Sequence, residues 1–468
     1  MDKQYDYLIL GSGPAGYVSA IRAAQSGLKV AVVEKDPEMF GGVCLNEGCI
    51  PAKSLFHSAE IIDTVRKNWD ICGLKCEPGS IDMSRMVAKS REAREQLCKG
   101  LSFLFSKNGI EIIYGTGCFV DRETVSITGV GGEQVLVKAK KFLISTGSGP
   151  KVLPGVPVDG KIVITSSEAI RLDNIPENIL IVGAGAIGIE FASFFNILGS
   201  KTTLVEMGQT VLPLEDKEVG KRMKSISKQN GIEVLTGSIV EKVSTGNGAA
   251  EVVINFQDNR KDGTYEKVLI ATGRVPAVSG IGIDKLGMDM DEKGFIRVDT
   301  RMRTSVENIY AAGDVVNSPM LAHVAYAEGE VAAVSAAGKE AYPVDYGCIP
   351  NAVYSNIRAA SVGANEEQLK SGGVAYKAGK QFFKSNGRAV ANSRTEGFIK
   401  VLAQAETRKL LGAHIVGYEA DELIHEFALA KRMSLTVDDI GRTVHAHPTF
   451  SETAVDACRS VFGKPVHG

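Results

Sequence analysis

The sequence contains the same short unit twice, and this duplication constrains the fold more than any other feature. Each copy starts with an apolar run that ends in the spacing Gly-x-Gly-x-x-Gly, at residues 11–16 and again at residues 183–188. A helical pattern and a second apolar run follow. That run ends at an acidic residue, Glu34 or Glu206, 23 positions after the first glycine (34 − 11 and 206 − 183). We therefore expect an α/β fold with two Rossmann-like dinucleotide-binding domains.

The spacing of this unit suits the pyrophosphate of a dinucleotide. The first glycine makes a tight turn, the second lets the backbone approach the pyrophosphate, and the third lets the helix pack closely on the strand. The helix N-terminus faces the phosphates, and the acidic residue accepts hydrogen bonds from a ribose diol. A glycine-rich loop would explain one copy, but not two in the same context. Electron relay between a bound flavin and a diffusible nicotinamide is the simplest chemistry for two such sites.

Each copy closes on a strand that runs into Thr-Gly, at Thr146-Gly147 and Thr272-Gly273. A further strand ends at Gly313-Asp314, before a helical pattern from about Leu321 to Ala336. Asp314 could cap that helix. Beside the two glycine motifs, we favour contact between its carboxylate and the ribityl chain of a flavin.

The eight cysteines are too sparse for a disulfide scaffold in a chain of 468 residues. Cys72 and Cys76 could face one another on a helix, but no second pair with metal-ligand spacing follows. We therefore predict no metal site there.

Cys44 and Cys49 form a different kind of pair, within the glycine-rich segment 41–53. Pro51 suits the first turn of a helix and places Cys49 near its N-terminus, where the dipole favours a thiolate. Cys44 lies in a stretch flexible enough to fold back, so the pair can close a small disulfide ring. A strained or exposed disulfide of this kind is readily reduced and reoxidised. Two inert buried cysteines are the alternative, which the position after the first dinucleotide unit disfavours.

The segment 445–452 (His-Ala-His-Pro-Thr-Phe-Ser-Glu) is the second dense cluster. A helical pattern begins after Pro448, with Glu452 in its first turn. Thiol–disulfide exchange needs a base, histidine titrates in the right range, and a nearby carboxylate would hold its tautomer. A metal site would lack a third nearby ligand, whereas a structural histidine pair remains an alternative. Spacing does not decide which of His445 and His447 is the base.

Lys53 lies one helical turn past Cys49 on the same face, and Glu190 opens the helix of the second unit. From the residues alone, both are interpreted as ordinary surface charges.

Composition excludes several classes of partner. The 53 basic and 55 acidic side chains leave a net charge of −2, which indicates neither nucleic acid nor an anionic membrane. No apolar run is long enough to cross a bilayer, and the N-terminus resembles neither a signal peptide nor a transit peptide. We expect a cytoplasmic protein, or one of the mitochondrial matrix if a presequence was removed.

Together, the two glycine motifs, the segment 41–53, Ala311–Asp314 and the segment 445–452 resemble the pyridine nucleotide–disulfide oxidoreductase family. The resemblance covers essentially the whole chain. Met320-Leu321-Ala322-His323 and the His-Ala-His-Pro-Thr form resemble its dihydrolipoamide dehydrogenase branch. That branch oxidises protein-bound dihydrolipoyl groups to lipoyl and reduces NAD⁺ to NADH, with FAD as its flavin. The resemblance also implies a homodimer and lipoyl-bearing partners: acyltransferase subunits of 2-oxoacid dehydrogenase complexes, or the lipoyl protein of glycine cleavage.

The resemblance implies where both cofactors bind. The FAD pyrophosphate would lie on the first glycine motif, its adenosine ribose at Glu34 and its ribityl chain near Asp314. The implied FAD contacts are Gly11, Gly13, Pro14, Ala15, Gly16, Glu34, Lys35, Gly42, Val43, Lys53, Thr146, Gly147, Gly313, Asp314, Met320, Leu321, Ala322 and His323. The implied NAD contacts are Gly183, Gly185, Ile187, Gly188, Glu206 and Gly273.

The same resemblance implies the catalytic roles. Cys49 would lie against the flavin, and Cys44 would exchange with the substrate. His447 would be the base and Glu452 its partner, both supplied by the other subunit. Lys53 would lie near the flavin ring and pair with Glu190.

The chain departs from the family pattern at two places: Val43 replaces a common threonine, and Ala325-Tyr326-Ala327 is less polar than usual. Both bear on redox tuning. Glutathione reductase-like members need cationic residues where this chain has Glu206, and mercuric reductase-like members carry a C-terminal cysteine pair where it has only Cys458. A transhydrogenase-like member would lack Cys44. A non-catalytic flavoprotein would not need the cysteine pair and the histidine segment together.

We predict four domains along the chain. An FAD-binding domain at residues 1–149 precedes an NAD-binding domain at 150–276. A central domain at 277–347 would complete the FAD site, and an α+β dimerisation domain would occupy 348–468. Strand-like runs in the last of these are Ala352–Tyr354, Phe398–Leu402 and Leu410–Val416.

Overall fold

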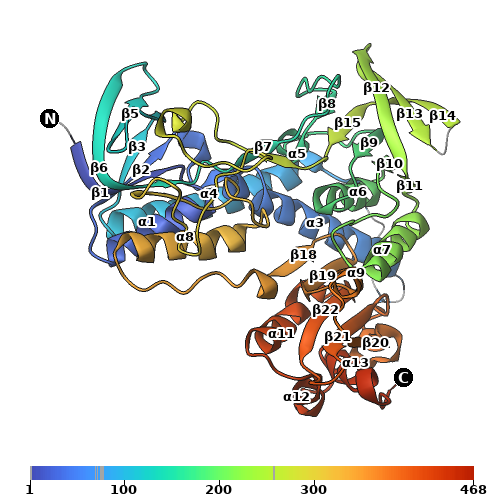
Figure 1. The fold of residues 1–468 in the computed structure, drawn as a ribbon. Coiled ribbons are helices and arrows are strands. Elements are labelled where there is room, and N and C mark those ends of the chain that lie inside the picture. Colours follow the sequence, from blue (N-terminus) through green and yellow to red (C-terminus); the bar gives the residue numbers. More distant parts are fainter. Residues whose placement is uncertain (1–2, 69, 71, 74–78, 257–258, 468) are drawn as a thin grey trace. The chain divides into compact units, whose positions relative to one another are not determined.

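The computed structural model describes residues 3–68, 70, 72–73, 79–256 and 259–467 (Figure 1). The chain divides into two compact units, each assembled from three segments. The first unit comprises Met1–Ser54, Ser84–Lys151 and Gly273–Val344; the second comprises Leu55–Met83, Val152–Thr272 and Asp345–Gly468. Each unit contains one glycine motif. The four domain boundaries expected from the sequence stay predictions.

The first unit is built on a mainly parallel sheet. Its strands are β1 (Lys3–Leu10), β2 (Val30–Glu34), β3 (Glu111–Tyr114), β4 (Thr116–Phe119), β5 (Thr124–Thr128), β6 (Gln134–Ile144) and β17 (Ile309–Ala311). The order is β3-β2-β1-β6-β5-β4, with β17 beside β6. The apolar run of β2 is buried along its whole length, as in a strand covered on both faces. A separate antiparallel pair joins β7 (Ser148–Pro150) and β16 (Arg274–Pro276).

Helices α1 (Pro14–Gln25) and α8 (Ala322–Ala336) lie side by side in the first unit, although they are far apart in the sequence (Figure 1). Glycine makes this approach possible, because a Cβ added at Gly329 would lie 2.4 Å from the carbonyl oxygen of Ala15. Other helices and 3₁₀ turns that begin in this unit are η1 (Pro37–Met39), α2 (Gly42–Asn46), α3 (Cys49–Asn68) and η2 (Ile283–Leu286). The long helix α4 (Met83–Lys107) follows Asp82.

The second unit contains its own parallel sheet, in the order β11-β10-β9-β15-β8: β8 (Val163–Ile164), β9 (Asn178–Val182), β10 (Lys201–Glu206), β11 (Glu233–Thr236) and β15 (Lys267–Ile270). An antiparallel sheet consists of β12 (Ser238–Gly246), β13 (Ala249–Phe256) and β14 (Asn259–Tyr265). The helices of this part are α5 (Ser166–Ala169), α6 (Ala186–Leu198) and α7 (Lys217–Gln229). The strand–turn–helix–strand unit β9–α6–β10 therefore repeats the arrangement of β1–α1–β2.

The C-terminal part of the second unit is an antiparallel sheet in the order β18-β19-β22-β21-β20: β18 (Pro350–Val353), β19 (Arg358–Gly363), β20 (Tyr376–Phe382), β21 (Phe398–Gln404) and β22 (Leu410–Gly417). Its longer helices are α11 (Ala420–Arg432) and α13 (Glu452–Phe462), and their apolar side chains form one core with the sheet. The short elements are η3 (Tyr346–Cys348), α9 (Glu366–Ser371), η4 (Phe383–Ser385), α10 (Gly387–Ala391) and α12 (Val437–Arg442).

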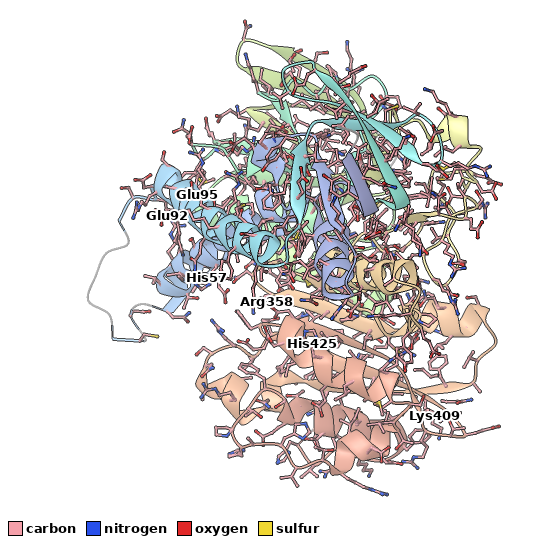
Figure 2. The ribbon with its side chains drawn as sticks, turned by 90° about the vertical axis from the view of Figure 1, so that its left-hand side faces the viewer. His57, Glu92, Glu95, Arg358, Lys409 and His425 are labelled. Atoms are coloured by element: carbon pink, nitrogen blue, oxygen red, sulfur yellow. The ribbon has the colours of Figure 1, made fainter. Side chains whose placement is uncertain are left out.

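Charged side chains join α3 to this sheet within the second unit. Arg358 of β19, labelled in Figure 2, donates to Glu60 of α3 at 2.9 Å and lies 3.4 Å from Asp421 of α11. Arg394 lies 3.5 Å from the other carboxylate oxygen of Glu60. These contacts hold the second half of α3 against the C-terminal part.

The structure confirms the predicted α/β class and refines several elements. Helices α1 and α6 each start three residues earlier than predicted, because Gly13 and Gly185 act as their N-caps and the helices begin directly after them. Cys44 lies in the short helix α2 rather than in an irregular stretch. Cys72 lies in a turn rather than on a helix, and Cys76 is outside the described residues.

Candidate active site

The first glycine motif forms a tight turn between β1 and α1. Gly11 has φ +97°, and a Cβ there would lie 2.4 Å from the carbonyl oxygen of Ser145. A Cβ at Gly16 would lie 1.9 Å from the carbonyl oxygen of Gly11, so only glycine lets the helix approach the turn this closely. A Cβ at Gly13 would lie 3.8 Å from the Cα of Gly42, an ordinary van der Waals contact, so the space beside Gly13 is shared with the segment that carries the cysteines.

Glu34 closes this turn from the end of β2. One of its carboxylate oxygens accepts from the backbone N–H of Ser12 at 3.0 Å and from the Ser12 hydroxyl at 2.5 Å. The carboxylate is 6 % exposed and lies beside the position where a ribose would meet the glycine turn. Lys35, the next residue, is exposed. Ser12 was not predicted as a site residue, because it occupies the first of the three variable positions of the motif.

The glycine-rich segment 41–53, which carries the two cysteines, contacts this turn directly. The backbone N–H of Gly41 donates to the Ser12 hydroxyl at 3.0 Å. Gly42 has φ +78°, and a Cβ there would lie 2.4 Å from the Cα of Gly13. The sequence did not predict this contact, because nothing in the spacing says which glycines meet. It places α2, with Val43 and Cys44, against the predicted pyrophosphate site.

Cys44 and Cys49 are brought together by the turn between α2 and α3. Both carry free thiols, and the Cys44 thiol donates to Cys49. This hydrogen bond, together with burial, raises the pKa of Cys44 above the ordinary thiol range. Cys49 is the first residue of α3 and is exposed, in agreement with its predicted place at a helix N-terminus. Two sulfurs in contact on adjoining helix ends can form and break a disulfide.

Two tyrosines lie beside the cysteines. The rings of Tyr17 and Tyr326 are 5.7 Å apart between centroids, and Tyr17 hydrogen-bonds Tyr326. Burial is the main cause that raises the pKa of both hydroxyls. Tyr326 is one of the departures from the family pattern. Tyr17 was not predicted, since it looked like an ordinary helix residue.

Gly313 and Asp314 follow the end of β17, which pairs with β6 in the sheet of the first unit. Gly313 has φ +77°, and its backbone N–H donates to the buried carboxylate of Glu328 at 2.7 Å. Asp314 accepts from the hydroxyl of Ser148 and lies 3.7 Å from Arg274. Neither Ser148 nor Arg274 was predicted. Asp314 does not cap α8, whose N-cap position is Leu321.

The remaining predicted FAD contacts line the same part of the first unit. The Thr146 hydroxyl donates to the carbonyl of Ala277 at 2.6 Å, and Gly147 has φ +75°. Met320 precedes Leu321, the N-cap of α8, and Ala322 and His323 form its first turn. Pro14 and Ala15 form the first turn of α1, where Ala15 is buried.

The second glycine motif repeats the geometry of the first. Gly183 has φ +104°, and a Cβ at Gly188 would lie 1.8 Å from its carbonyl oxygen. A Cβ at Gly185 would have no described atom within 4 Å. Glu206 accepts from the backbone N–H of Ala184 at 2.7 Å, as Glu34 does from Ser12. The matching position of the two carboxylates follows from the shared spacing.

The other predicted NAD contacts flank this turn. Ile187 lies in the first turn of α6 and is partly exposed, and Gly273 has φ +116°. Glu206 also accepts from the N–H of Gly208 at 2.7 Å and is 8 % exposed. Its carboxylate is therefore held in one orientation at the end of β10.

Glu190 and Lys53 belong to different units. Glu190 is 6 % exposed in α6 and accepts from the backbone N–H of Tyr354 at 2.9 Å. The interpretation as a surface charge is therefore wrong for Glu190. Lys53 lies in the first part of α3 and is partly buried. The pairing of the two stays a prediction.

The two histidines of the segment 445–452 differ in their surroundings. Nδ1 of His447 lies 2.9 Å from Glu452, whose other oxygen accepts from the backbone N–H of Thr449 at 2.8 Å. The His447 side chain is 77 % exposed. His445 is only 9 % exposed, and its two ring nitrogens lie 3.0 Å from Thr443 and Glu426. An exposed imidazole held by one nitrogen can use the other as a base.

Within residues 3–68, 70, 72–73, 79–256 and 259–467, no group of three or more His, Cys, Asp or Glu side chains could hold a metal ion. Among the helices of the same part of the chain, none is long and apolar enough to span a membrane.

Comparison with known proteins gives a consistent result. The model of the pyridine nucleotide-disulphide oxidoreductases matches residues 5–329, and the model of their dimerisation domain matches residues 349–458. The mitochondrial dihydrolipoyl dehydrogenase of Pisum sativum is 39 % identical over 464 residues, 99 % of this chain and 92 % of that protein. The dihydrolipoyl dehydrogenase of Bacillus subtilis is 38 % identical and is covered completely, as is this chain. The crystal structure of LpdA from Mycobacterium tuberculosis aligns with a TM-score of 0.89 at 26 % identity, over 98 % of this chain and 99 % of that one.

Proposed function

The chain belongs to the pyridine nucleotide-disulphide oxidoreductase family, and we propose that it is a dihydrolipoyl dehydrogenase that uses FAD and NAD. One structural observation carries the proposal. The cysteine pair is fixed to the first dinucleotide turn through the Gly41–Ser12 hydrogen bond and the Gly42–Gly13 contact. Full-length similarity to dihydrolipoyl dehydrogenases supports it.

The residues around the first turn fit FAD. Gly13 is the N-cap of α1, so the N-terminus of this helix faces the proposed pyrophosphate position, and Glu34 lies at the ribose position. Asp314 and Thr146 lie just after the ends of β17 and β6. We assign them to contacts with the ribityl chain. The bound flavin supplies a two-electron carrier between the cysteine pair and the nicotinamide.

The two cysteines divide the chemistry. The disulfide form of the pair accepts attack by a dihydrolipoyl thiolate at the Cys44 sulfur, which releases Cys49 as a thiolate. The second substrate thiolate then attacks the mixed disulfide, so oxidised lipoyl leaves and Cys44 becomes a thiolate that takes up a proton. The substrate loses two electrons and the cysteine pair gains them. The N-terminus of α3 stabilises the Cys49 thiolate.

His447 and Glu452 are the proposed base and its carboxylate partner in this thiol–disulfide exchange. His447 takes the proton of the attacking substrate thiol, and Glu452 holds the ring through Nδ1. The chain carries the family's dimerisation domain at residues 349–458. We place the functional site between two copies, with the histidine and carboxylate of one copy serving the cysteines of the other. Lys53 and Glu190 are proposed to pair near the flavin ring.

Glu206 makes NAD, rather than NADP, the nucleotide of the second turn. Its carboxylate is oriented by Ala184 and Gly208, and it would repel a 2′-phosphate at the ribose position. Lipoyl-bearing proteins are the proposed source of the dithiol, either acyltransferase cores of 2-oxoacid dehydrogenase complexes or the glycine cleavage lipoyl protein. The cytoplasm or the mitochondrial matrix is the proposed location.

The test is steady-state oxidation of dihydrolipoamide by the purified flavoprotein, with NAD⁺ and NADP⁺ in parallel. We expect turnover with NAD⁺ and far less with NADP⁺. Absence of turnover with both, in protein that retains FAD, would refute the substrate and direct attention to other disulfides of the same family.

A further inference from the structure

A buried ion pair joins the nucleotide-binding part of the second unit to its C-terminal sheet. Nζ of Lys400, in β21, lies 2.9 Å and 3.0 Å from the two carboxylate oxygens of Asp216. The two side chains are 3 % and 1 % exposed. Lys400 also lies 3.1 Å from Glu218 and 3.2 Å from Glu366. Charges buried to this degree are almost always paired, so the contact is built into the fold.

Asp216 is also the N-cap residue of α7. One of its oxygens accepts from the backbone N–H of Glu218 at 2.9 Å, and the other is 3.4 Å from the N–H of Glu366. Burial disfavours the carboxylate, but the hydrogen bonds from Lys400 and the electrostatic effect of His414 outweigh it and hold the pKa of Asp216 below its ordinary value. Lys400 therefore binds an ionised group that starts a helix.

Asp216 also ends the segment that follows Glu206, which we call the nucleotide loop (residues 207–216). This loop returns to the second glycine turn, where the N–H of Leu212 donates to the carbonyl of Ala184 at 2.8 Å. The N–H of the same Ala184 donates to Glu206. Leu212 is 4 % exposed and has φ +49°, a conformation that only close packing holds in a leucine.

The other side of the nucleotide loop is closed by α7. A Cβ at Gly220 would lie 2.5 Å from the Thr210 hydroxyl and 2.6 Å from the carbonyl of Val211. The loop and the helix are thus in direct backbone contact. A continuous set of contacts, at Val211 and Leu212 of the loop, therefore links the start of α7 to the glycine turn.

The C-terminal part contacts this region at more than one point. Asn351 of β18 donates to Glu215 at 2.6 Å, and Lys380 of β20 donates to Glu218 at 2.5 Å. The ring of His414 on β22 is buried, which lowers its pKa. Lys400 is the buried cation at the centre of these contacts.

We propose that Lys400 is a positioning residue for the nicotinamide nucleotide site, acting through Asp216 and the nucleotide loop. The inference rests on the proposed binding of NAD at Gly183–Gly188. Replacement of a buried ion pair by apolar side chains of similar volume is often neutral for stability, and in some proteins the pair serves to fix one arrangement of the structure. The role of the pair is therefore to set the geometry of the loop from the C-terminal sheet.

The test uses the double variant Lys400→Met/Asp216→Asn in the full-length flavoprotein. Asparagine keeps the cap on α7, and methionine keeps much of the lysine volume, so no uncompensated charge arises from the pair itself. NADH affinity is measured by direct fluorescence titration. The rate of flavin reduction by dihydrolipoamide without NAD⁺ is measured separately.

We expect the dissociation constant for NADH to rise roughly tenfold, within the range that residues remote from a ligand exert on its affinity. The FAD content and the rate of flavin reduction by dihydrolipoamide stay at the wild-type level. Lys217→Met is the matched control, because Lys217 is the next residue after Asp216 at the start of α7 but is largely exposed and lies 3.4 Å from Glu367 of α9 rather than beside the buried pair. This control keeps wild-type NADH affinity.

Wild-type NADH affinity in the folded double variant would overturn the proposal, and so would an equal loss of NADH affinity and flavin reduction, which would mark a general structural defect. A conservative Lys400→Arg variant that restores the pair with Asp216 should bind NADH more tightly than Lys400→Met. If wild-type protein itself fails to bind NADH, the proposed nucleotide site is refuted, and that outcome is separate from the result for the variants.

Discussion

Nδ1 of His447 lies 2.9 Å from a carboxylate oxygen of Glu452, and the second oxygen of Glu452 accepts from the backbone N–H of Thr449. The carboxylate is therefore fixed by the backbone before it orients the imidazole. These hydrogen bonds also lower the pKa of Glu452, the backbone contact from Thr449 first and the His447 contact after it. An ionised, fixed carboxylate selects the tautomer that leaves the exposed ring nitrogen able to accept a proton.

Replacement of His447, the proposed base, should slow the oxidation of dihydrolipoamide by the cysteine pair. We expect His447→Gln to lower kcat for dihydrolipoamide oxidation by roughly 10²–10⁴-fold, and Glu452→Gln to lower it by less. Glu426→Gln is the matched control, because Glu426 is the carboxylate partner of the other histidine, which it contacts at Nε2 of His445 instead of Nδ1. A larger loss in Glu426→Gln than in Glu452→Gln would identify His445 as the base instead.

Loss of the exchange cysteine should separate flavin binding from disulfide chemistry. We expect Cys44→Ser to retain FAD, since the contacts of the first glycine turn do not use its sulfur, and to lose lipoamide turnover. Absorbance of the bound flavin and the dihydrolipoamide assay measure the two properties. Cys348→Ser, remote in the sequence and outside the proposed site, should keep both. Loss of flavin in Cys44→Ser would contradict its assigned role.

Glu206 should set the preference for NAD. In Glu206→Arg the carboxylate that repels a 2′-phosphate is replaced by a cation, so the ratio of kcat/KM for NADP⁺ to that for NAD⁺ should rise at least about tenfold. Overall activity should fall as well, because Ala184 and Gly208 lose their acceptor. An unchanged ratio would count against Glu206 as the discriminating residue.

Two glycines of the second motif should respond differently to alanine. A Cβ at Gly188 would lie 1.8 Å from a backbone oxygen, so Gly188→Ala should lower the free energy of unfolding by about 1–3 kcal/mol or more. A Cβ at Gly185 meets no described atom within 4 Å, so Gly185→Ala should unfold near the wild-type midpoint but bind NADH more weakly. Thermal melts and NADH titration distinguish the two. Equal destabilisation in both variants would contradict the proposed division of roles.

Because of Asp216, the free energy of unfolding should decrease at acidic pH. Its folded-state pKa is below the unfolded value, so its ionised form stabilises the protein above about pH 3.9 and this contribution is lost as pH falls through the folded pKa. Glu218 and Glu366 contribute in the same direction, because their lysine contacts outweigh burial and lower their pKa values. The free energy of unfolding of the wild type should therefore fall more steeply below about pH 4 than that of Lys400→Met/Asp216→Asn. Denaturant titrations at several pH values measure this, and a steeper fall in the variant would contradict it.

Local patterns in the sequence determined much of the candidate site. The two glycine units, their acidic ends and the cysteine pair at the start of α3 depend on residues close in the chain, where turn geometry and helix periodicity dictate the residue types. The helices began slightly earlier than predicted, because a glycine can serve as N-cap before the apolar pattern becomes visible.

Tertiary structure alone decided the remaining relationships. Spacing could not choose between His445 and His447, and the structure distinguishes them by burial and by their carboxylate partners. The contact of Gly42 with Gly13 and the pairing of Lys400 with Asp216 join residues far apart in the sequence. Such contacts depend on how whole elements pack, and no short-range pattern encodes them. A lysine inside a strand pattern gives no sign that it is buried until the carboxylate that neutralises it is seen.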